Sequence, residues 1–190
     1  MMKNWNIFKY LLFTLVLLGK SEGLATEKDR DYTVHPPKLS VPGGEAGETR
    51  RVITQFHNWT LICDENRTLK QGICNVTQAI HDGDDNTIFS WSLVSTKNGQ
   101  PVMLLRTLPD ADTDVPIQVF VDGLKKPVLI RYTQCNHAVC LAQTPVGPIF
   151  SKQIEQNKNV RISYKIKEGE IFSFTTPFKG LNEALTSLQR

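Results

Sequence analysis

Beyond its first 25 residues, the sequence lacks the motifs that mark common enzyme classes. It contains no G-x-S-x-G nucleophile motif, no H-E-x-x-H metal motif and no glycine-rich phosphate loop. Its histidines are scattered, and none stands at a diagnostic spacing from a carboxylate. Internal repeats and low-complexity tracts are also missing. We therefore expect a protein that is not an enzyme and that carries no cofactor.

The chain also lacks a hydrophobic run long enough to span a membrane, which takes roughly 20 residues. Its longest apolar run, Leu11 to Leu18, follows a stretch that carries Lys3 and Lys9 but no acid. Small residues, Gly23 and Ala25, come shortly afterwards. This order predicts a secretory signal peptide over residues 1–25, cleaved after Ala25. We expect the mature chain to have no transmembrane segment and to reside in the periplasm, in the cell envelope or outside the cell.

A strong excess of charge is missing as well. The whole chain has 22 basic and 19 acidic side chains, a net charge of +3. Cleavage would remove three lysines and one glutamate, so the net charge of the mature chain would fall to +1. A nearly neutral chain does not attract polyanions as a whole, so we expect no nucleic-acid partner.

Cysteine is scarce, and the spacing of the four residues excludes the common zinc and redox modules, which need C-x2-C pairs. In an exported chain, four cysteines predict two disulfides. Three pairings are open, and we favour the local ones, Cys63–Cys74 and Cys135–Cys140. A four-residue hairpin loop would place the latter two about 5.5 Å apart in Cα. Each disulfide should add roughly 2–3 kcal/mol of stability.

The mature chain divides into an arm and a domain. Residues 26–55 are charged, rich in proline and glycine and poor in large apolar groups, which predicts a flexible arm. Residues 56–190 are long enough for a single domain with its own core.

Within that domain, apolar and polar residues alternate. In the segment from Asn159, Val160, Ile162 and Tyr164 fall on one face and Arg161 and Ser163 on the other. Turn dipeptides such as Asp-Gly and Asn-Gly separate the segments. We expect an all-β fold, an antiparallel sandwich or a partly open barrel. About nine strands are expected, at 59–64, 73–80, 87–95, 101–108, 116–121, 128–133, 138–143, 159–167 and 171–176.

Two segments have helical character. Residues 146–156 are moderately helical, and the C-terminal segment places Leu181, Ala184, Leu185 and Leu188 on one face. We expect one or two short helices, including a C-terminal helix that closes one end of the sheets.

Two acidic loops could supply oxygen ligands to calcium, because each alternates acidic or amide residues in the pattern D-x-D-x-[DN]. Neither has the glycine at position six or the glutamate at position twelve of an EF-hand. The alternative for both is a solvated turn between strands. The candidate ligands are Asp82, Asp84 and Asn86 in one loop, and Asp110, Asp112 and Asp114 in the other.

The polar face of the alternating segment at 159–167 carries three cations, Arg161, Lys165 and Lys167. This is a candidate binding face for acidic glycans or anionic membranes. The solvent face of any strand has the same composition, so a purely solvating role is the alternative.

The order of these pieces resembles the invasion-associated locus B family of Gram-negative bacteria. The resemblance rests on "FHNWTLIC" from Phe56, "GICNV", "RYTQCNHAVCLA", "NVRISYKI" and the closing "TTPFKGLNEAL". It implies an exported, disulfide-bonded β-sandwich associated with entry into host cells, notably erythrocytes, and it implies structural roles for the cysteines and Trp59. No catalytic residues follow from it. We expect a binding module with a host-surface partner; the alternative is a periplasmic envelope-homeostasis or stress factor that affects invasion indirectly.

Overall fold

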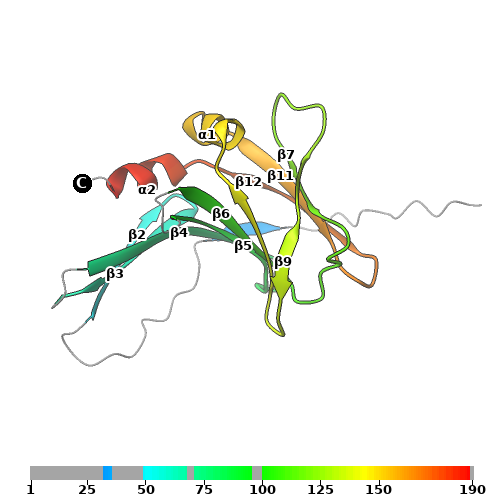
Figure 1. Ribbon diagram of the computed structural model, residues 1–190, viewed down its shortest axis with the longest axis horizontal. Coiled ribbons are helices and arrows are strands. Elements are labelled where there is room, and N and C mark those ends of the chain that lie inside the picture. The colour runs from blue at the N-terminus through cyan, green and yellow to red at the C-terminus, as the bar shows by residue number, and fades with distance from the viewer. Residues whose placement is uncertain (1–31, 36–48, 68–70, 96–99, 189–190) are drawn as a thin grey trace, which may run out of the picture.

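The computed structural model describes residues 32–35, 49–67, 71–95 and 100–188, and these residues form two antiparallel sheets and two helices. In these ranges we find no helix with the length and apolarity needed to cross a bilayer. The all-β sandwich predicted from the sequence is confirmed, and the sheets do not close into a barrel (Figure 1).

The large sheet has eight strands in the order β2-β3-β4-β5-β6-β10-β9, with β1 paired to the end of β4. Successive hairpins build it from β2 to β6, because each strand pairs with the one that follows it in the chain. The strands are β1 (Thr33–His35), β2 (Thr49–Phe56), β3 (Trp59–Asn66), β4 (Gln71–His81), β5 (Thr87–Ser95), β6 (Pro101–Thr107), β9 (Tyr132–Cys135) and β10 (Cys140–Pro145).

The small sheet has four strands in the order β12-β11-β7-β8. Its strands are β7 (Ile117–Phe120), β8 (Val128–Ile130), β11 (Asn159–Lys165) and β12 (Ile171–Pro177). The predicted alternation in β11 is confirmed, because Val160, Ile162 and Tyr164 are buried and Arg161 is exposed.

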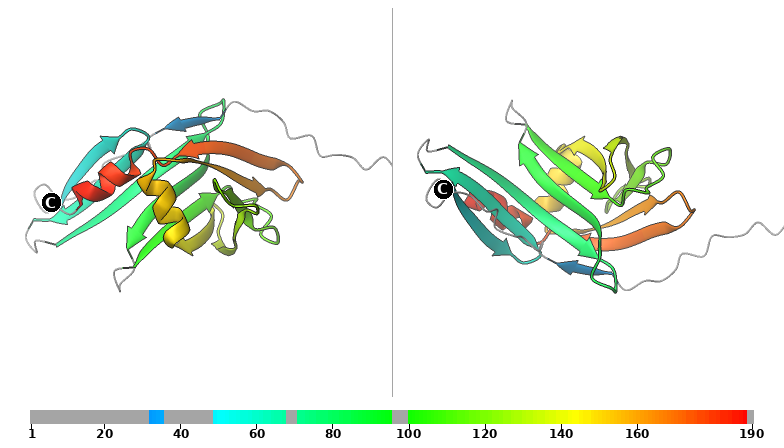
Figure 2. Two further views of the ribbon diagram at one scale, coloured as in Figure 1. Left: turned by 90° about the horizontal axis from the view of Figure 1, so that it is seen from above. Right: turned by 90° about the horizontal axis from the view of Figure 1, so that it is seen from below.

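Both helices lie on one face of the large sheet (Figure 2). The first, α1, spans Pro148–Glu155, and the second, α2, spans Leu181–Ser187 and contacts β2, β3 and β4. The predicted C-terminal helix is therefore present, but it lies on a face of the large sheet instead of closing one end of the sheets. We call the opposite face of the large sheet its outer face.

Aromatic rings fill the space between the sheets. The rings of Trp59 and Trp91 lie 5.3 Å apart between centroids, and Phe178 stacks on Trp91 at 5.2 Å. Phe89 of the large sheet contacts Phe174 of the small sheet at 5.1 Å. Buried aromatic pairs at such distances stabilise a core beyond the effect of apolar burial alone.

One buried polar side chain, Gln78, links the two sheets. Its Oε1 accepts hydrogen bonds from Trp91 Nε1 at 2.8 Å and from the hydroxyl of Thr176, and its Nε2 donates to Pro177 O at 3.4 Å. The indole of Trp59 donates to the same carbonyl at 3.1 Å. Gln78 is fully buried, so these bonds compensate for the loss of its hydration.

The strand count differs from the expected nine: the described residues form twelve. The predicted strand 128–133 is split at Arg131, so that β8 joins the small sheet and β9 joins the large one. The predicted signal peptide lies outside the described residues, as does much of the predicted arm.

Two further strands, β1 and β2, lie within the segment predicted to be an arm. Its charged residues argued against packing, but in β2 they form cross-strand ion pairs with β3. Arg50 pairs with Glu65 at 3.1 Å, and Arg51 makes two hydrogen bonds to Asp64. Hydrogen bonding to Arg51, assisted by its charge, holds the pKa of the Asp64 carboxyl below its ordinary value. The folded domain therefore extends further toward the N-terminus than the sequence suggested.

The start of α2 depends on a close backbone approach at Gly180. This residue has φ 97°, and a Cβ placed on it would lie 2.2 Å from the carbonyl oxygen of Phe56. Only glycine fits here for two reasons. The left-handed backbone conformation is strained for any residue with a side chain, and a Cβ atom would collide with the backbone of β2.

We expect Gly180→Ala to lower the free energy of unfolding by at least about 3 kcal/mol. Gly169→Ala is the matched control, because Gly169 also has a positive φ of 92° but no atom within 4 Å of its Cβ position. It should cost only the backbone strain, about 1–2 kcal/mol. Urea unfolding of both variants measures the difference; equal losses would show that the contact with Phe56 does not restrict this position.

We expect Gln78→Leu to destabilise the protein by about 2–4 kcal/mol, because it leaves buried donors on Trp91 and Thr176 without their acceptor. Gln143→Leu, at an exposed position of β10, should change stability by less than about 0.5 kcal/mol. Thermal unfolding followed by circular dichroism compares the two. A Gln78 variant as stable as the control would contradict the linking role of this amide.

Candidate functional site

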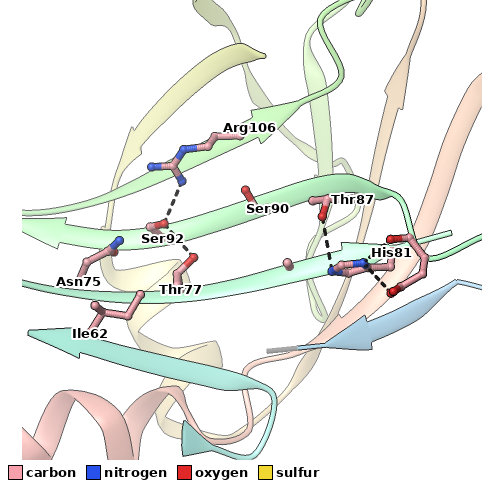
Figure 3. A pocket seen from close by; sticks show the side chains of 10 residues that line it. Ile62, Asn75, Thr77, His81, Thr87, Ser90, Ser92 and Arg106 are labelled. Atoms are coloured by element: carbon pink, nitrogen blue, oxygen red, sulfur yellow. Dashed lines mark hydrogen bonds and ion pairs between the residues drawn. The ribbon is translucent and has the colours of Figure 1, made fainter. Parts of the chain in front are cut away.

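A hollow of about 340 Å³ lies in the outer face of the large sheet, and we call it the outer-face pocket. Side chains of β3, β4, β5 and β6 line it together with the turn that follows β4 (Figure 3). Apart from Ile62 and Ala79 its lining is polar or charged, with Asn75, Thr77, His81, Thr87, Ser90, Ser92, Asp85 and Arg106.

The register of the strands brings these residues together. Thr77 of β4 pairs with Ser92 of β5, and Ser90 of β5 pairs with Arg106 of β6. Because side chains alternate along a strand, all four point away from the core. The pocket is thus made from outward positions of strands whose inward positions, such as Trp91, form the core.

Three of these side chains form a hydrogen-bond chain across three strands (Figure 3). Arg106 Nη1 donates to Ser92 Oγ at 2.9 Å, Ser92 Oγ donates to Thr77 Oγ1 at 3.1 Å, and Thr77 Oγ1 donates to the carbonyl of Trp91 at 3.1 Å. Each hydroxyl both donates and accepts, so the chain fixes the orientation of the guanidinium.

Arg106 is only partly solvated, and among the described residues it has one hydrogen bond and no ion pair. Burial lowers the pKa of its guanidinium from the ordinary value, although arginine stays protonated at neutral pH. Four of its five N–H groups are therefore not used by the described part of the chain. The remaining N–H groups of this partly buried cation are suited to charge-assisted hydrogen bonds with an anion.

The opposite end of the pocket contains a histidine and a carboxylate. His81 is buried, and its Nδ1 lies 3.1 Å from Asp85 Oδ1 and from the Asp85 carbonyl. Its Nε2 is 3.5 Å from Thr87 Oγ1. The order Thr87, His81, Asp85 is that of a nucleophile, a base and an acid. The distance from Thr87 Oγ1 to His81 Nε2 is longer than the roughly 2.6–3.2 Å over which a proton is transferred.

An unsatisfied acceptor lies beyond the Arg106 guanidinium, on the side away from His81 (Figure 3). The Oδ1 of Asn75 is buried and has no hydrogen-bond partner within the described ranges. Since a buried polar atom without a partner is costly, this oxygen offers an acceptor to a ligand that donates a hydrogen bond.

The structure confirms both predicted disulfides, Cys63–Cys74 between β3 and β4 and Cys135–Cys140 between β9 and β10. The Cα atoms of the second pair are 4.0 Å apart, closer than the 5.5 Å expected. The reason is the hydrogen-bond pattern of the hairpin. Asn136 N donates to Val139 O, so the next pair along the strands, Cys135 and Cys140, is a non-hydrogen-bonded pair. The Cα atoms of such pairs lie closer together than those of hydrogen-bonded pairs. The disulfides do not line the outer-face pocket.

The predicted basic face lies on the small sheet, away from this pocket, and two of its cations already have partners. The guanidinium of Arg161 lies 3.7 Å above the ring of Phe120, and Lys165 Nζ is 3.1 Å from Asp112 Oδ2. Lys167 is exposed. The structure therefore does not gather the three charges into a common site.

The acidic loops use their oxygens locally. Asp82 Oδ1 accepts from the backbone N–H groups of Asp84 at 3.0 Å and Asn86 at 2.9 Å, as in an Asx-turn. In the second loop, Asp112 accepts from the N–H of Asp114 at 3.3 Å and also pairs with Lys165, as described above.

Asp110 is exposed, and its carbonyl accepts a hydrogen bond from the N–H of Lys167. Among the described residues, no group of three or more histidine, cysteine, aspartate or glutamate side chains could hold a metal ion.

Sequence reasoning did not identify the outer-face pocket, because its residues come from four strands and form no motif. Two features of the sequence do point to the outward faces of β5 and β6. Ser90 and Ser92 alternate with aromatic residues in β5, and Arg106 is the only charged residue of the apolar strand β6.

We expect calcium not to bind, so that the melting temperature stays the same in excess CaCl2 and in excess chelator, each at the same ionic strength. Ligand binding to the folded state alone would raise it. An increase specific to calcium, not reproduced by MgCl2, would show that the acidic loops rearrange to coordinate the ion.

Comparisons with known proteins place this fold in context. The family model described as "Invasion associated locus B (IalB) protein" matches residues 59–189. A similar solved structure is the crystal structure of invasion associated protein B from Bartonella henselae, with 14% sequence identity and a TM-score of 0.60. The match covers 72% of this chain and 94% of that one. At this identity the likeness concerns the fold alone. Comparison with curated proteins finds no match.

Proposed function

Because the chain belongs to the invasion associated locus B (IalB) family, we propose that it is an exported, non-catalytic binding module that promotes association with host cells, notably erythrocytes. The family match over residues 59–189 is the observation that carries this proposal. The module acts by recognition: its folded part presents a preformed polar pocket on an open sheet face.

Export is supported by three independent features. The N-terminus has the pattern of a signal peptide. All four cysteines are paired in disulfides, which persist in oxidising compartments. Membership of the IalB family is also consistent with an exported protein. We propose a location at the cell surface, where a recognition module reaches its partner directly.

Protease treatment of intact bacteria tests the location. We expect an added protease to degrade the protein while a known periplasmic protein, which controls for leakage, survives. Protection of both proteins would place the chain behind the outer membrane. In that case the role would be that of a periplasmic envelope factor, and direct adhesion would be excluded.

Recognition itself is tested with the purified, fluorescently labelled mature chain. It should bind erythrocytes saturably, and excess unlabelled chain should displace it. The same chain, reduced and alkylated so that both disulfides are open, is the control for non-specific adhesion. Binding that does not saturate, or that is equal for both preparations, would contradict the proposal.

A further inference from the structure

The outer-face pocket contains an uncompensated positive charge at a fixed place. Arg106 is held by Ser92 and has no carboxylate partner in the described part of the chain, whereas the other charge in the pocket, Asp85, contacts His81. The pocket is therefore polarised, with a cationic end in the middle of the sheet and a carboxylate at the end of β4. A ligand that fits this pattern carries its negative charge at one end only.

The two ends discriminate between anions. A phosphate group carries between one and two charges at neutral pH, and its sites usually combine several cations or N–H donors. Arg106 is the only basic residue that lines this pocket besides His81, and the Asp85 carboxylate would repel a second negative charge. A single carboxylate matches the planar fork of one guanidinium better.

The pocket also contains groups that bind hydroxyls. Ser90 and Thr77 supply hydroxyls, and Asn75 supplies the buried oxygen that lacks a partner. Small or aliphatic side chains, Ala79 and Ile62, leave room for the C–H face of a ring. The hollow of about 340 Å³ is at the lower end of the range for small-molecule sites. It accommodates one sugar unit, and its open side permits that unit to continue into a longer glycan.

We propose that the outer-face pocket binds one carboxylate-bearing sugar unit, with Arg106 pairing with the carboxylate and Asn75, Thr77 and Ser90 contacting the hydroxyls. This inference rests on the proposed function, since acidic sugars are a component that a host-cell binding module can recognise. It also moves the binding face from the small sheet, where the sequence placed it, to the large one.

The test titrates the full mature chain with glucuronate and with glucose, which differ by a carboxylate in place of a CH2OH group. Binding is followed by amide shifts in β4, β5 and β6. We expect glucuronate to bind with a dissociation constant of roughly millimolar and glucose at least tenfold more weakly. Equal binding of the two sugars would overturn the proposal. Equal shifts with acetate would overturn it too, because they would indicate a general anion site.

Variants locate the site. Arg106→Gln keeps a donor for Ser92 and removes the charge, so it should weaken glucuronate binding roughly tenfold or more. Arg161→Gln on the small sheet is the matched control and should bind normally. Loss in the control rather than in R106Q would overturn the assignment. If R106Q does not fold, Ser90→Val should still weaken binding by filling the hollow, and unchanged binding in S90V would count against the pocket.

The erythrocyte assay separates the two proposals. Cell binding that persists while glucuronate does not bind would overturn the sugar site and leave the binding function intact. Glucuronate binding without cell binding would confirm the site and contradict the host-cell role.

Discussion

The relative position of the two sheets depends on one buried amide. Gln78 of β4 receives hydrogen bonds from Trp91 of β5 and Thr176 of β12, and it donates to Pro177 at the end of β12. Since an unpaired polar group is expensive in such a core, only one relative position of the sheets keeps all of these groups satisfied. The aromatic rings around it contribute apolar burial, which has no direction, whereas the hydrogen bonds of the amide are directional.

The same strands that hold this amide also carry the outer-face pocket. Along β4, Gln78 points into the core while its neighbours Thr77 and Ala79 point into the hollow. Along β5, Trp91 points inward between Ser90 and Ser92. The backbone below the pocket is therefore fixed from the other side by the best-packed part of the molecule. Such support orients a binding group before a ligand arrives and reduces the entropy lost on binding.

Sequence patterns predicted the fold well where one face of a strand is apolar. Residues 87–95 and the alternation around Tyr164 agree with β5 and β11, and both disulfides pair as expected. Strand β2 was not predicted, because its sequence shows no apolar alternation. Its arginines instead form ion pairs with the neighbouring strand, β3.

The candidate site was beyond sequence analysis for a related reason. Alternation shows which side chains point outward, but only the register shows that Arg106 meets Ser90 and that Ser92 meets Thr77. The two cations of β11, Arg161 and Lys165, lie in one short segment of the sequence, but they contact Phe120 and Asp112. A cluster formed across strands leaves almost no trace in any single segment.

The disulfides have a consequence for how the protein responds to proteolysis. Each joins residues that face each other directly on neighbouring strands, and each encloses a short stretch of chain, from Cys63 to Cys74 and from Cys135 to Cys140. If a protease cuts within either stretch, the two fragments stay covalently joined and their strands keep their partners. The chain can therefore be cut in both hairpins and still hold together as one molecule.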